Sequence, residues 1–360
     1  MSPLYDLAIV GASFSGLACA RAAAGRGLTT LVIDRKPLAG HRMHTTGLLV
    51  KEVADKLNVP SHLTRQIKGV RLYSPNLRHV DLEAPGYYFL ATEIQGLMAW
   101  LAGEAQSAGS ELRFGAAYRG ASRKGEHLQL HKLGCSARFL CGADGPSSAV
   151  ARDFKLSVNT EFLIGVEAEY EGVGNVDPDR LHCFLDSRLA PGYIGWVIPG
   201  VNITQIGLAC RLPNKPRLKA FVQKIAALFD MARAKVLNHR GGLIPVGGRV
   251  AKWHGGDGRV LLTGDAAGIV SPLTAGGIHT AIDSGWYAAH AIADFLDGGP
   301  PPYSALEQHY PRFRLKRWMR RALDLNPPNA LYNLMLGNPL FRSIAAEIYF
   351  HRRARKSLTP

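Results

Sequence analysis

Three short segments at the start of the chain alternate in character. Residues 5–11 (YDLAIVG) form an apolar run that ends in glycine, residues 15–27 are rich in alanine, and residues 28–34 (LTTLVID) form a second apolar run closed by an acid. A short, continuous apolar run is typical of a buried strand, whereas the alanine-rich stretch favours a helix. We therefore predict a β-α-β unit in which the helix starts at the C-terminal end of the first strand.

The pattern changes twice further along. Residues 94–109 predict a helix, and short strands are expected at LRFG, HLQLHK and ARFLCGAD. From about 160 to 250 the apolar runs become strand-like, as in FLIGVEAEY, GYIGWVIP and ITQIGLAC. RVLLTGDA then returns to the first pattern and leads into a helix from about 277 to 296, after which the chain is helical and basic.

These elements predict an α/β protein with a Rossmann-like nucleotide-binding domain, an inserted, mainly antiparallel β-sheet domain that binds substrate, and a C-terminal helical segment. At 360 residues the chain is too long for one simple core, which favours two joined domains. We assign residues 1–70, 95–155 and 250–300 to the first domain, 71–94 and 156–249 to the second, and 301–360 to the basic C-terminal helices.

The composition bears on the cellular compartment of the protein. No run of 18 apolar residues is present, and the N-terminus lacks a basic segment followed by a cleavage site. The five cysteines are odd in number and show no C-x-x-C spacing, so reduced thiols are expected, with no disulfide framework and no metal site. We therefore expect a cytoplasmic protein.

Positive charge is concentrated at the C-terminal end. The net charge is +15, and residues 301–360 hold 11 Lys and Arg against 3 Asp and Glu, which gives +8 in the last sixth of the chain. The segments 312–323 (RFRLKRWMRRAL) and 341–356 (FRSIAAEIYFHRRARK) mix these cations with apolar side chains. Two interpretations stay open: helices that associate peripherally with the inner face of a membrane, or helices packed on the protein with a solvated charged face. No motif supports nucleic-acid binding.

The first glycine motif predicts a dinucleotide site. Residues 11–16 (GASFSG) fit G-x-G-x-x-G with serine in the second position, and Asp34 ends the second strand 23 residues after Gly11. Such a turn lets the backbone approach a pyrophosphate at a helix start, and the acid can hold a ribose hydroxyl while repelling the 2′-phosphate of NADP. The expected contacts here are Gly11, Ala12, Ser13, Ser15, Gly16, Asp34 and Arg35, with Arg42 as a further anion partner.

Two later motifs suggest which dinucleotide binds. Residues 142–145 (GADG) are followed by Ser148 and Arg152, and residues 264–267 (GDAA) by Pro272 and Gly276-Gly277. Together with the first motif, they resemble the FAD-dependent group that includes aromatic hydroxylases and geranylgeranyl reductases. The resemblance implies FAD, with an aspartate at the ribityl chain and a helix start at the pyrimidine edge of the flavin, where free N–H groups stabilise negative charge. The implied contacts are Asp144, Gly145, Gly264, Asp265, Ala266, Pro272, Gly276, Gly277 and Ile278.

Within this group the chain is most similar to the geranylgeranyl reductase-like family. The similarity rests on SPLTAGGIH at 271–279 and on PGYIGWVIP at 191–199, followed by Gly207-Leu208. It implies an FAD-dependent oxidoreductase that reduces carbon–carbon double bonds of a prenyl or other hydrophobic substrate by hydride transfer. Thr45 and Thr46 stand where the family often has cysteine and glycine, which leaves the substrate and the proton donor open.

Other functions stay open. GWVIP partly resembles a halogenase segment, so the alternative is a monooxygenase or halogenase in which NAD(P)H reduces the flavin and a C4a-(hydro)peroxide attacks a hydrophobic or aromatic substrate. A flavoprotein that serves as a carrier or assembly subunit is a third interpretation. Because no second dinucleotide motif is present, the reductant is either transiently bound NAD(P)H or a ferredoxin-type donor.

Candidate catalytic residues are few. His44, Thr45 and Tyr193 are candidates for proton delivery, and Thr46, Tyr193 and Trp196 for the substrate pocket. The pKa of a histidine lies near neutral pH, which suits a proton donor, but a solvated loop is the favoured account of His41 and His44. Trp196 belongs either to the core or to the pocket.

Overall fold

The computed structural model describes residues 3–350, and its internal contacts divide the chain into two compact units. The first unit comprises Met1–Arg42, Gln95–Glu161 and Ile244–Arg317, and the second comprises Met43–Ile94, Phe162–Leu243 and Trp318–Pro360. Successive segments therefore alternate between the units, so each unit is completed only by segments that are distant in sequence.

A mainly parallel sheet organises the first unit. Its strands follow the order β8-β2-β1-β11-β10-β9, and β17 also pairs with β11. The strands β8, β2, β1, β11 and β17 run parallel, whereas β9 and β10 add an antiparallel hairpin. The strands are β1 (Leu4–Val10), β2 (Thr30–Asp34), β8 (Glu111–Phe114), β9 (Ala121–Lys124), β10 (His127–Leu130), β11 (Cys135–Gly142) and β17 (Val260–Leu262). The helices are α1 (Phe14–Gly25), α3 (Ile94–Ser107), α4 (Ala149–Asp153), α6 (Ile278–Leu296) and α7 (Pro302–His309), with a short 3-10 turn, η2 (Gly264–Ala267).

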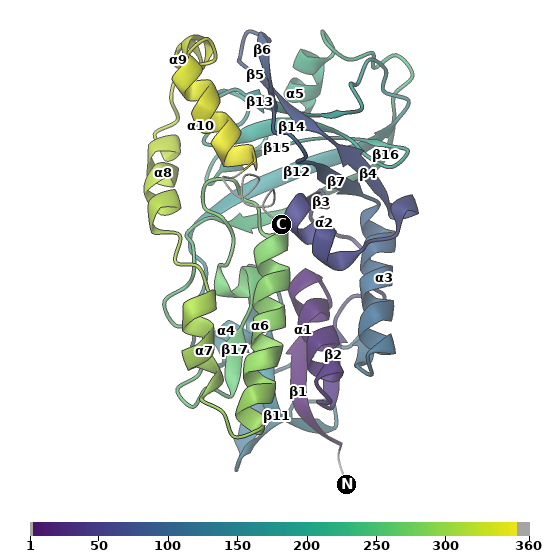
Figure 1. Ribbon diagram of the computed structural model, residues 1–360, viewed down its shortest axis with the longest axis vertical. Helices are drawn as coiled ribbons and strands as arrows, with labels where there is room; N and C mark the ends of the chain where they lie inside the picture. The colour runs from purple at the N-terminus through teal and green to yellow at the C-terminus, as the bar shows by residue number, and fades with distance from the viewer. Residues whose placement is uncertain (1–2, 351–360) are drawn as a thin grey trace. The chain divides into compact units, whose positions relative to one another are not determined.

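Helices α1 and α6 pack tightly side by side against this sheet (Figure 1). A Cβ atom placed on Gly285 of α6 would lie 2.1 Å from the backbone oxygen of Ser15, and one on Gly264 would lie 2.9 Å from the Ser15 Cβ. Carbon atoms do not approach an oxygen this closely, so the contact requires glycine at position 285. The packing brings the start of α1 beside the turn at Gly264.

A second sheet organises the second unit. Its order is β16-β12-β15-β14-β13-β5-β6, in which β12, β15, β14 and β13 form an antiparallel run and β5 pairs parallel with β13. A smaller antiparallel sheet has the order β3-β7-β4. The strands are β3 (Leu48–Val50), β4 (Thr64–Ile67), β5 (Gly69–Tyr73), β6 (His79–Glu83), β7 (Phe89–Thr92), β12 (Phe162–Glu171), β13 (Arg180–Leu185), β14 (Ile194–Pro199), β15 (Thr204–Arg211) and β16 (Lys235–Pro245). The helices are α2 (Lys51–Leu57), the 3-10 turn η1 (Ser61–Leu63), α5 (Leu218–Ile225), α9 (Asn329–Met335) and α10 (Pro339–Phe350). The division between the units falls within α8 (Arg314–Asp324), after Arg317.

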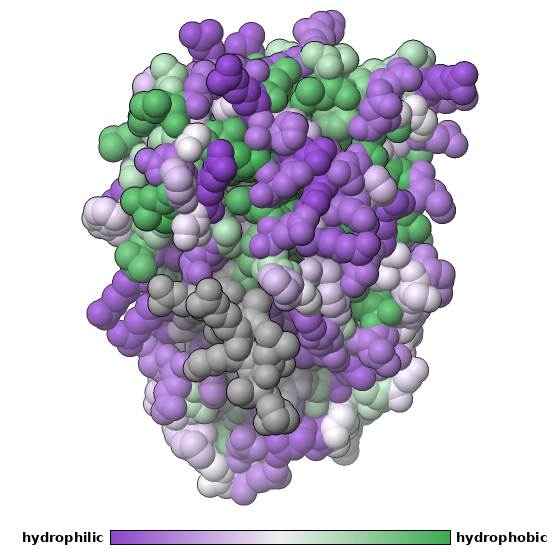
Figure 2. Space-filling model, turned by 45° about the horizontal axis from the view of Figure 1, so that its top comes forward, coloured by the Kyte–Doolittle hydropathy of each residue, from purple (hydrophilic) through white to green (hydrophobic). Residues whose placement is uncertain are grey.

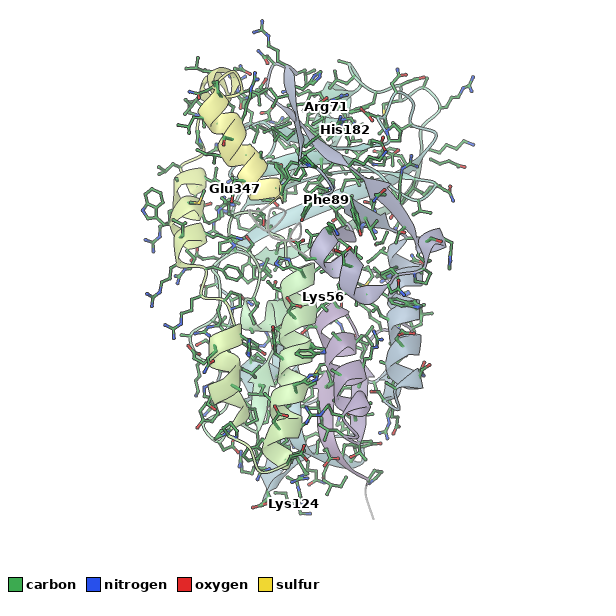
Figure 3. The ribbon with its side chains drawn as sticks, in the orientation of Figure 1. Lys56, Arg71, Phe89, Lys124, His182 and Glu347 are labelled. Atoms are coloured by element: carbon green, nitrogen blue, oxygen red, sulfur yellow. The ribbon has the colours of Figure 1, made fainter. Side chains whose placement is uncertain are left out.

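Apolar side chains cover both faces of the larger second-unit sheet. Neighbouring residues of one strand point to opposite faces, and Val197 packs with Phe221 of α5 whereas Ile198 belongs to the cluster that contains Phe350 of α10. His182, labelled in Figure 3, lies on the α5 face. Its Nδ1 is 3.0 Å from the Tyr73 hydroxyl. Burial lowers the pKa of His182 to about 4, so this imidazole is neutral at pH 7 and structural.

The structure confirms the predicted α/β class and the main elements. The helices expected at 15–27, 94–109 and about 277–296 are α1, α3 and α6, and the strand-like runs between 160 and 250 form β12, β14 and β15. The pattern missed the short elements β3, α2, β4, β5, β6, β7, β9 and α5, each of eight residues or fewer. Residues 351–360, which complete the second basic segment, lie outside the described residues. Within residues 3–350, no helix is long and apolar enough to cross a membrane.

Candidate functional site

The first glycine motif forms the turn between β1 and α1. Gly11 has a φ of +106°, and a Cβ atom there would lie 2.3 Å from the backbone oxygen of Ala143. Both the backbone conformation and the close approach require glycine. The turn therefore sits directly against the chain that leaves β11, where the second predicted motif begins.

The start of α1 has no side-chain cap. Ser13 occupies the N-cap position but makes no capping hydrogen bond, and the first turn holds no acidic residue. The Ser15 hydroxyl is buried and has no protein partner. Backbone N–H groups at an uncapped helix start form an anion site, because they donate to negative oxygens and lie at the positive end of the helix dipole. The arrangement suits a pyrophosphate.

Asp34 closes β2 beside this turn. Its Oδ2 accepts a hydrogen bond from the Ala12 N–H at 2.8 Å, and its Oδ1 accepts one from the Lys36 N–H at 2.8 Å. A carboxylate offers about four acceptor positions, so Asp34 keeps capacity for ribose hydroxyls. The side chains of Arg35 and Arg42 are exposed, and Arg42 adopts a positive φ of 46°.

Two residues of the second motif cap helix α4, a role that the sequence did not predict. Asp144 Oδ2 accepts hydrogen bonds from the N–H groups of Ala149 at 2.6 Å and Val150 at 3.1 Å, and Ser148 Oγ accepts one from Ala151 at 2.9 Å. Both side chains therefore cap α4. The other carboxylate oxygen of Asp144, Oδ1, is buried without a protein partner. Any contact of Asp144 with the cofactor would use this oxygen.

The third motif forms η2 and the entry to α6. Burial raises the pKa of Asp265 to about 6. Helix α6 begins at Ile278 with Gly277 as N-cap, so no side chain caps its first turn, and that turn holds no acid. A Cβ atom on Gly277 would lie 3.4 Å from Asp265 Oδ1, which places this carboxylate next to the helix start. Ala266 and Pro272 are buried, whereas Gly276 is partly exposed.

Asn159 joins the second motif to the third, and sequence reasoning missed it. Its Nδ2 donates to the backbone oxygens of Pro146 at 3.1 Å and Asp265 at 2.8 Å. A single asparagine in a loop carries no sequence signal, because its partners lie 13 and 106 residues away. It fixes the Asp265 turn relative to the chain after β11.

The predicted cofactor residues all lie in the first unit, and they fit FAD. Two helix starts without side-chain caps belong to α1 and α6, which are in contact. Ser15 Oγ and Asp144 Oδ1 are buried polar atoms without protein partners. The start of α1 suits the pyrophosphate, and the start of α6 suits the electron-rich edge of a flavin. Asp34 suits the ribose.

The predicted substrate and proton-donor residues all lie in the second unit. Thr45 Oγ1 accepts from the Gly47 N–H at 3.4 Å, so this hydroxyl shapes the local turn. The backbone oxygen of Thr46 accepts from Gln205 Nε2 at 3.1 Å. His44 is exposed, and Tyr193 is half-buried. Burial raises the pKa of Tyr193 above its ordinary value, so the phenol keeps its proton.

Trp196 anchors a buried polar network. Its Nε1 donates to Glu167 Oε2 at 2.6 Å, and Glu167 also accepts from Arg240 Nε at 2.7 Å. Arg240 Nη1 lies 2.9 Å from Glu169 Oε1. Glu167 is 3% exposed, and its burial raises its pKa. The indole ring lies over Gly207, where a Cβ atom would come within 2.6 Å of Cζ2. Trp196 is thus held flat on the sheet, on the apolar face that includes Ile198.

Comparisons with known proteins agree with this site. Residues 5–315 match the family model described as "FAD binding domain". The chain is 28% identical over 308 residues to a geranylgeranyl diphosphate reductase of Rhodobacter capsulatus, covering 82% of this chain and 77% of that protein. It is 29% identical over 342 residues to a digeranylgeranylglycerophospholipid reductase of Methanosarcina acetivorans, covering 88% and 81%.

Solved structures share the fold. A geranylgeranyl bacteriochlorophyll reductase-like protein from Thermoplasma acidophilum superposes with a TM-score of 0.84 at 20% identity, covering 99% of this chain and 98% of that one. The flavin-dependent brominase Bmp2 superposes with a TM-score of 0.75 at 16% identity, covering 97% and 94%. The chain therefore belongs to the FAD binding domain family and is an FAD-dependent oxidoreductase of the geranylgeranyl reductase-like type.

Proposed function

We propose that this flavoprotein reduces carbon–carbon double bonds of a prenyl or related hydrophobic substrate. The observation that carries the proposal is that relatives aligned over more than 80% of this chain are named as reductases of geranylgeranyl compounds. The brominase and halogenase likenesses are limited to the fold, since their identities are 16%. The sequence feature PGYIGWVIP also favours the reductase.

The second unit offers a wall suited to an isoprenoid chain. Ile194, Trp196 and Ile198 occupy alternate positions of β14 and share one face of the sheet. Ile198 is packed in the cluster that contains Phe350 of α10, whereas Ile194 and Trp196 are only partly buried, so these two side chains would contact the substrate. Glu167 fixes the indole ring through its N–H, so the ring presents an apolar surface with its polar atom already satisfied. Flexible prenyl chains bind by burial of apolar area, for which such a face is suited.

Reduction of a double bond adds a hydride to one carbon and a proton to the other. FAD, when bound and reduced, supplies the hydride, and NAD(P)H or a ferredoxin-type donor supplies its electrons. Among the candidates we propose Tyr193 as the proton donor, because its phenol is half-buried and protonated at neutral pH; burial raises its pKa, which makes it a weak acid. Thr45 Oγ1 shapes the local turn by accepting from Gly47, and His44 is exposed.

Anaerobic photoreduction of the purified protein tests the proposal. The reduced protein is mixed with prenyl compounds, such as geranylgeranyl diphosphate and digeranylgeranyl lipids, and separately with aromatic compounds. We expect reoxidation of the flavin by a prenyl compound, with a product that has gained two hydrogens. In a parallel reaction under air with halide present, oxygen consumption that depends on an aromatic substrate, with an oxygenated or halogenated product and no prenyl turnover, would favour the oxygenase instead. Mixing the oxidised protein with NADPH, NADH or reduced ferredoxin identifies the donor.

A further inference from the structure

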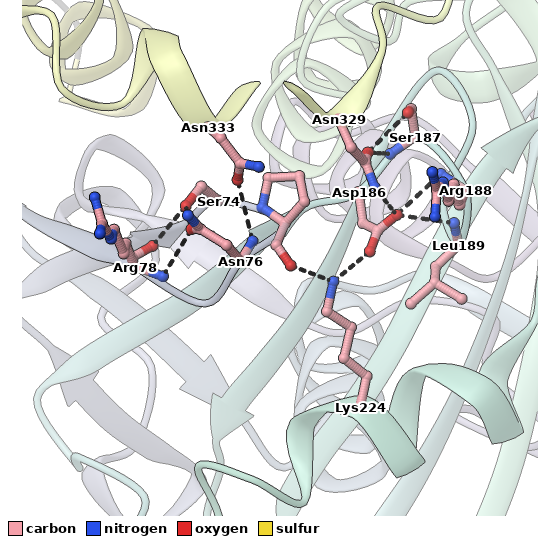
Figure 4. Close-up of polar contacts among 11 residues, drawn as sticks. Ser74, Asn76, Arg78, Asp186, Ser187, Arg188, Leu189, Lys224, Asn329 and Asn333 are labelled. Carbon is pink, nitrogen blue, oxygen red and sulfur yellow. Dashed lines mark hydrogen bonds and ion pairs between the residues drawn. The ribbon is translucent and has the colours of Figure 1, made fainter. Parts of the chain in front are cut away.

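Helix α9 buries Tyr332 but exposes both of its leucines and turns its asparagines inward. Its asparagines face the protein: Asn329 Oδ1 accepts from the N–H and the hydroxyl of Ser187, both at 2.8 Å, and Asn333 Oδ1 accepts from the Asn76 N–H at 3.1 Å (Figure 4). Its leucines face solvent, with Leu331 41% and Leu334 76% exposed. Surface helices normally bury their leucines and expose their polar side chains.

Buried polar contacts fix this orientation. Asn329 Nδ2 donates to Asp186 Oδ1 at 3.0 Å, and Asp186 Oδ2 pairs with Lys224 Nζ at 2.5 Å (Figure 4). Asp186 is 5% exposed, and rotation of α9 that buried its leucines would remove the hydrogen bonds of Asn329 to Asp186 and Ser187 and that of Asn333 to Asn76. The exposure of the leucines is therefore built into the fold.

Helix α8 shows the same feature with charges added. Its exposed residues form two adjacent stripes, each with i, i+3, i+7 spacing: Leu315, Trp318 and Ala322 in one, and Arg314, Arg317 and Arg321 in the other. Leu315 and Trp318 are 70% and 67% exposed. Arg320 lies on the opposite face, where it is buried and donates a hydrogen bond to the backbone oxygen of Gly192. Arg211 Nε lies 3.4 Å from Asp324 Oδ2, and these two contacts with segments outside α8 hold the helix in this rotation.

The exposed apolar side chains are concentrated in these helices. Of the fifteen large hydrophobic side chains exposed among residues 3–350, seven lie between positions 315 and 344. We call these seven the C-terminal apolar surface: Leu315, Trp318, Leu325, Leu331, Leu334, Leu340 and Ile344. Figure 2 shows hydrophobic surface, interrupted by hydrophilic side chains, on the side of the view where Figure 1 places α8 and α9. Apolar surface gathered in this way marks an interaction site.

We propose that the C-terminal apolar surface docks on the headgroup region of an anionic lipid bilayer. Leucine and tryptophan side chains at helix surfaces enter the interface between headgroups and acyl chains, and neighbouring arginines attract anionic lipids. Residues 312–350 hold seven Lys and Arg against two acids, one of which, Asp324, is paired with Arg320. A second copy fits less well, because a two-fold contact brings the same patch, with its arginine stripe, against itself.

Vesicle flotation with the full-length holoprotein tests this inference, which goes beyond the proposed function because it needs no substrate. Vesicles of phosphatidylcholine alone are compared with vesicles that also contain phosphatidylglycerol. We expect binding to the anionic vesicles that weakens with salt. The variant Leu331→Gln/Leu334→Gln should bind about tenfold or more weakly, and Arg314→Gln/Arg317→Gln/Arg321→Gln on the order of 100-fold more weakly.

Two control variants make the same kinds of substitution, to glutamine, at exposed positions outside the C-terminal apolar surface. Val236→Gln/Leu237→Gln removes two exposed apolar side chains from β16, and Lys215→Gln/Arg217→Gln/Lys219→Gln removes three exposed cations near α5. Both controls should bind like the unchanged protein, and all variants should keep their FAD absorbance and thermal unfolding temperature. Absence of binding to anionic vesicles, or equal loss in the controls, would overturn the inference. So would a dimer in sedimentation equilibrium that the leucine changes dissolve while vesicle binding persists.

Discussion

Asp265, which we expect to contact FAD, should destabilise the folded protein when its carboxylate is charged. Burial raises the pKa of its carboxyl from 3.8 to about 6, so the folded protein binds this proton more tightly than the unfolded chain. Stability from this group is fully present below pH 3.8 and is lost as the pH rises through about 6. Asp265→Asn removes the titration while keeping the shape of the side chain.

The size of the effect follows from the two pKa values. Each pKa unit corresponds to about 1.4 kcal/mol, so the charged carboxylate costs about 3 kcal/mol above pH 7. At pH 4.5 the same calculation gives a cost of about 1 kcal/mol. In protein stripped of FAD, Asp265→Asn should therefore raise the free energy of unfolding at both pH values, by about 2 kcal/mol more at pH 7.5 than at pH 4.5.

Urea denaturation at the two pH values measures this difference, with Glu126→Gln as the control, because the Glu126 side chain is 82% exposed. The same substitution should weaken FAD retention, measured by flavin fluorescence on dilution, since an amide offers fewer acceptor positions for ribityl hydroxyls. The two readouts thus move in opposite directions. An Asp265→Asn gain in stability that is equal at both pH values, or a loss at pH 7.5, would refute the reasoning.

Three further changes test the packing and the networks. Gly285→Ala should destabilise by about 1–3 kcal/mol because its Cβ meets the Ser15 backbone, whereas Gly103→Ala in α3, with open space around it, should stabilise by about 0.5–1 kcal/mol; thermal unfolding compares the pair. Asn159→Ala should lower FAD affinity more than stability, because the Asp265 turn loses its link to Pro146; titration of apoprotein with FAD measures it. Arg240→Gln should cost about 3–5 kcal/mol in urea unfolding by leaving Glu167 buried without its charged partner, and adding Glu167→Gln should recover part of that loss; a full-sized loss in the double variant would contradict the network.

The cofactor-binding half could be anticipated because its signals are local. A turn between a strand and a helix needs glycine where the backbone approaches its neighbour, and Gly11 shows both the positive φ and the contact with Ala143 that the motif implied. The alanine-rich stretch likewise predicted α1, because alanine favours a helix, and the short, continuous apolar run predicted the buried strand β1. The sequence thus predicted the fold class, the order of the elements and FAD.

Other properties depend on partners that are far apart along the chain, and only the tertiary structure decided them. The side chains of Trp196, Glu167 and Arg240 are in contact because their strands, β14, β12 and β16, belong to one sheet. Their spacing in the sequence does not predict this contact. The asparagines of α9 face inward because buried groups such as Asp186 need their hydrogen bonds. The composition predicted a basic, amphipathic C-terminal segment, but long-range polar contacts decided the direction in which the leucines of α9 point, because rotation of the helix would break the asparagine hydrogen bonds to Asp186, Ser187 and Asn76.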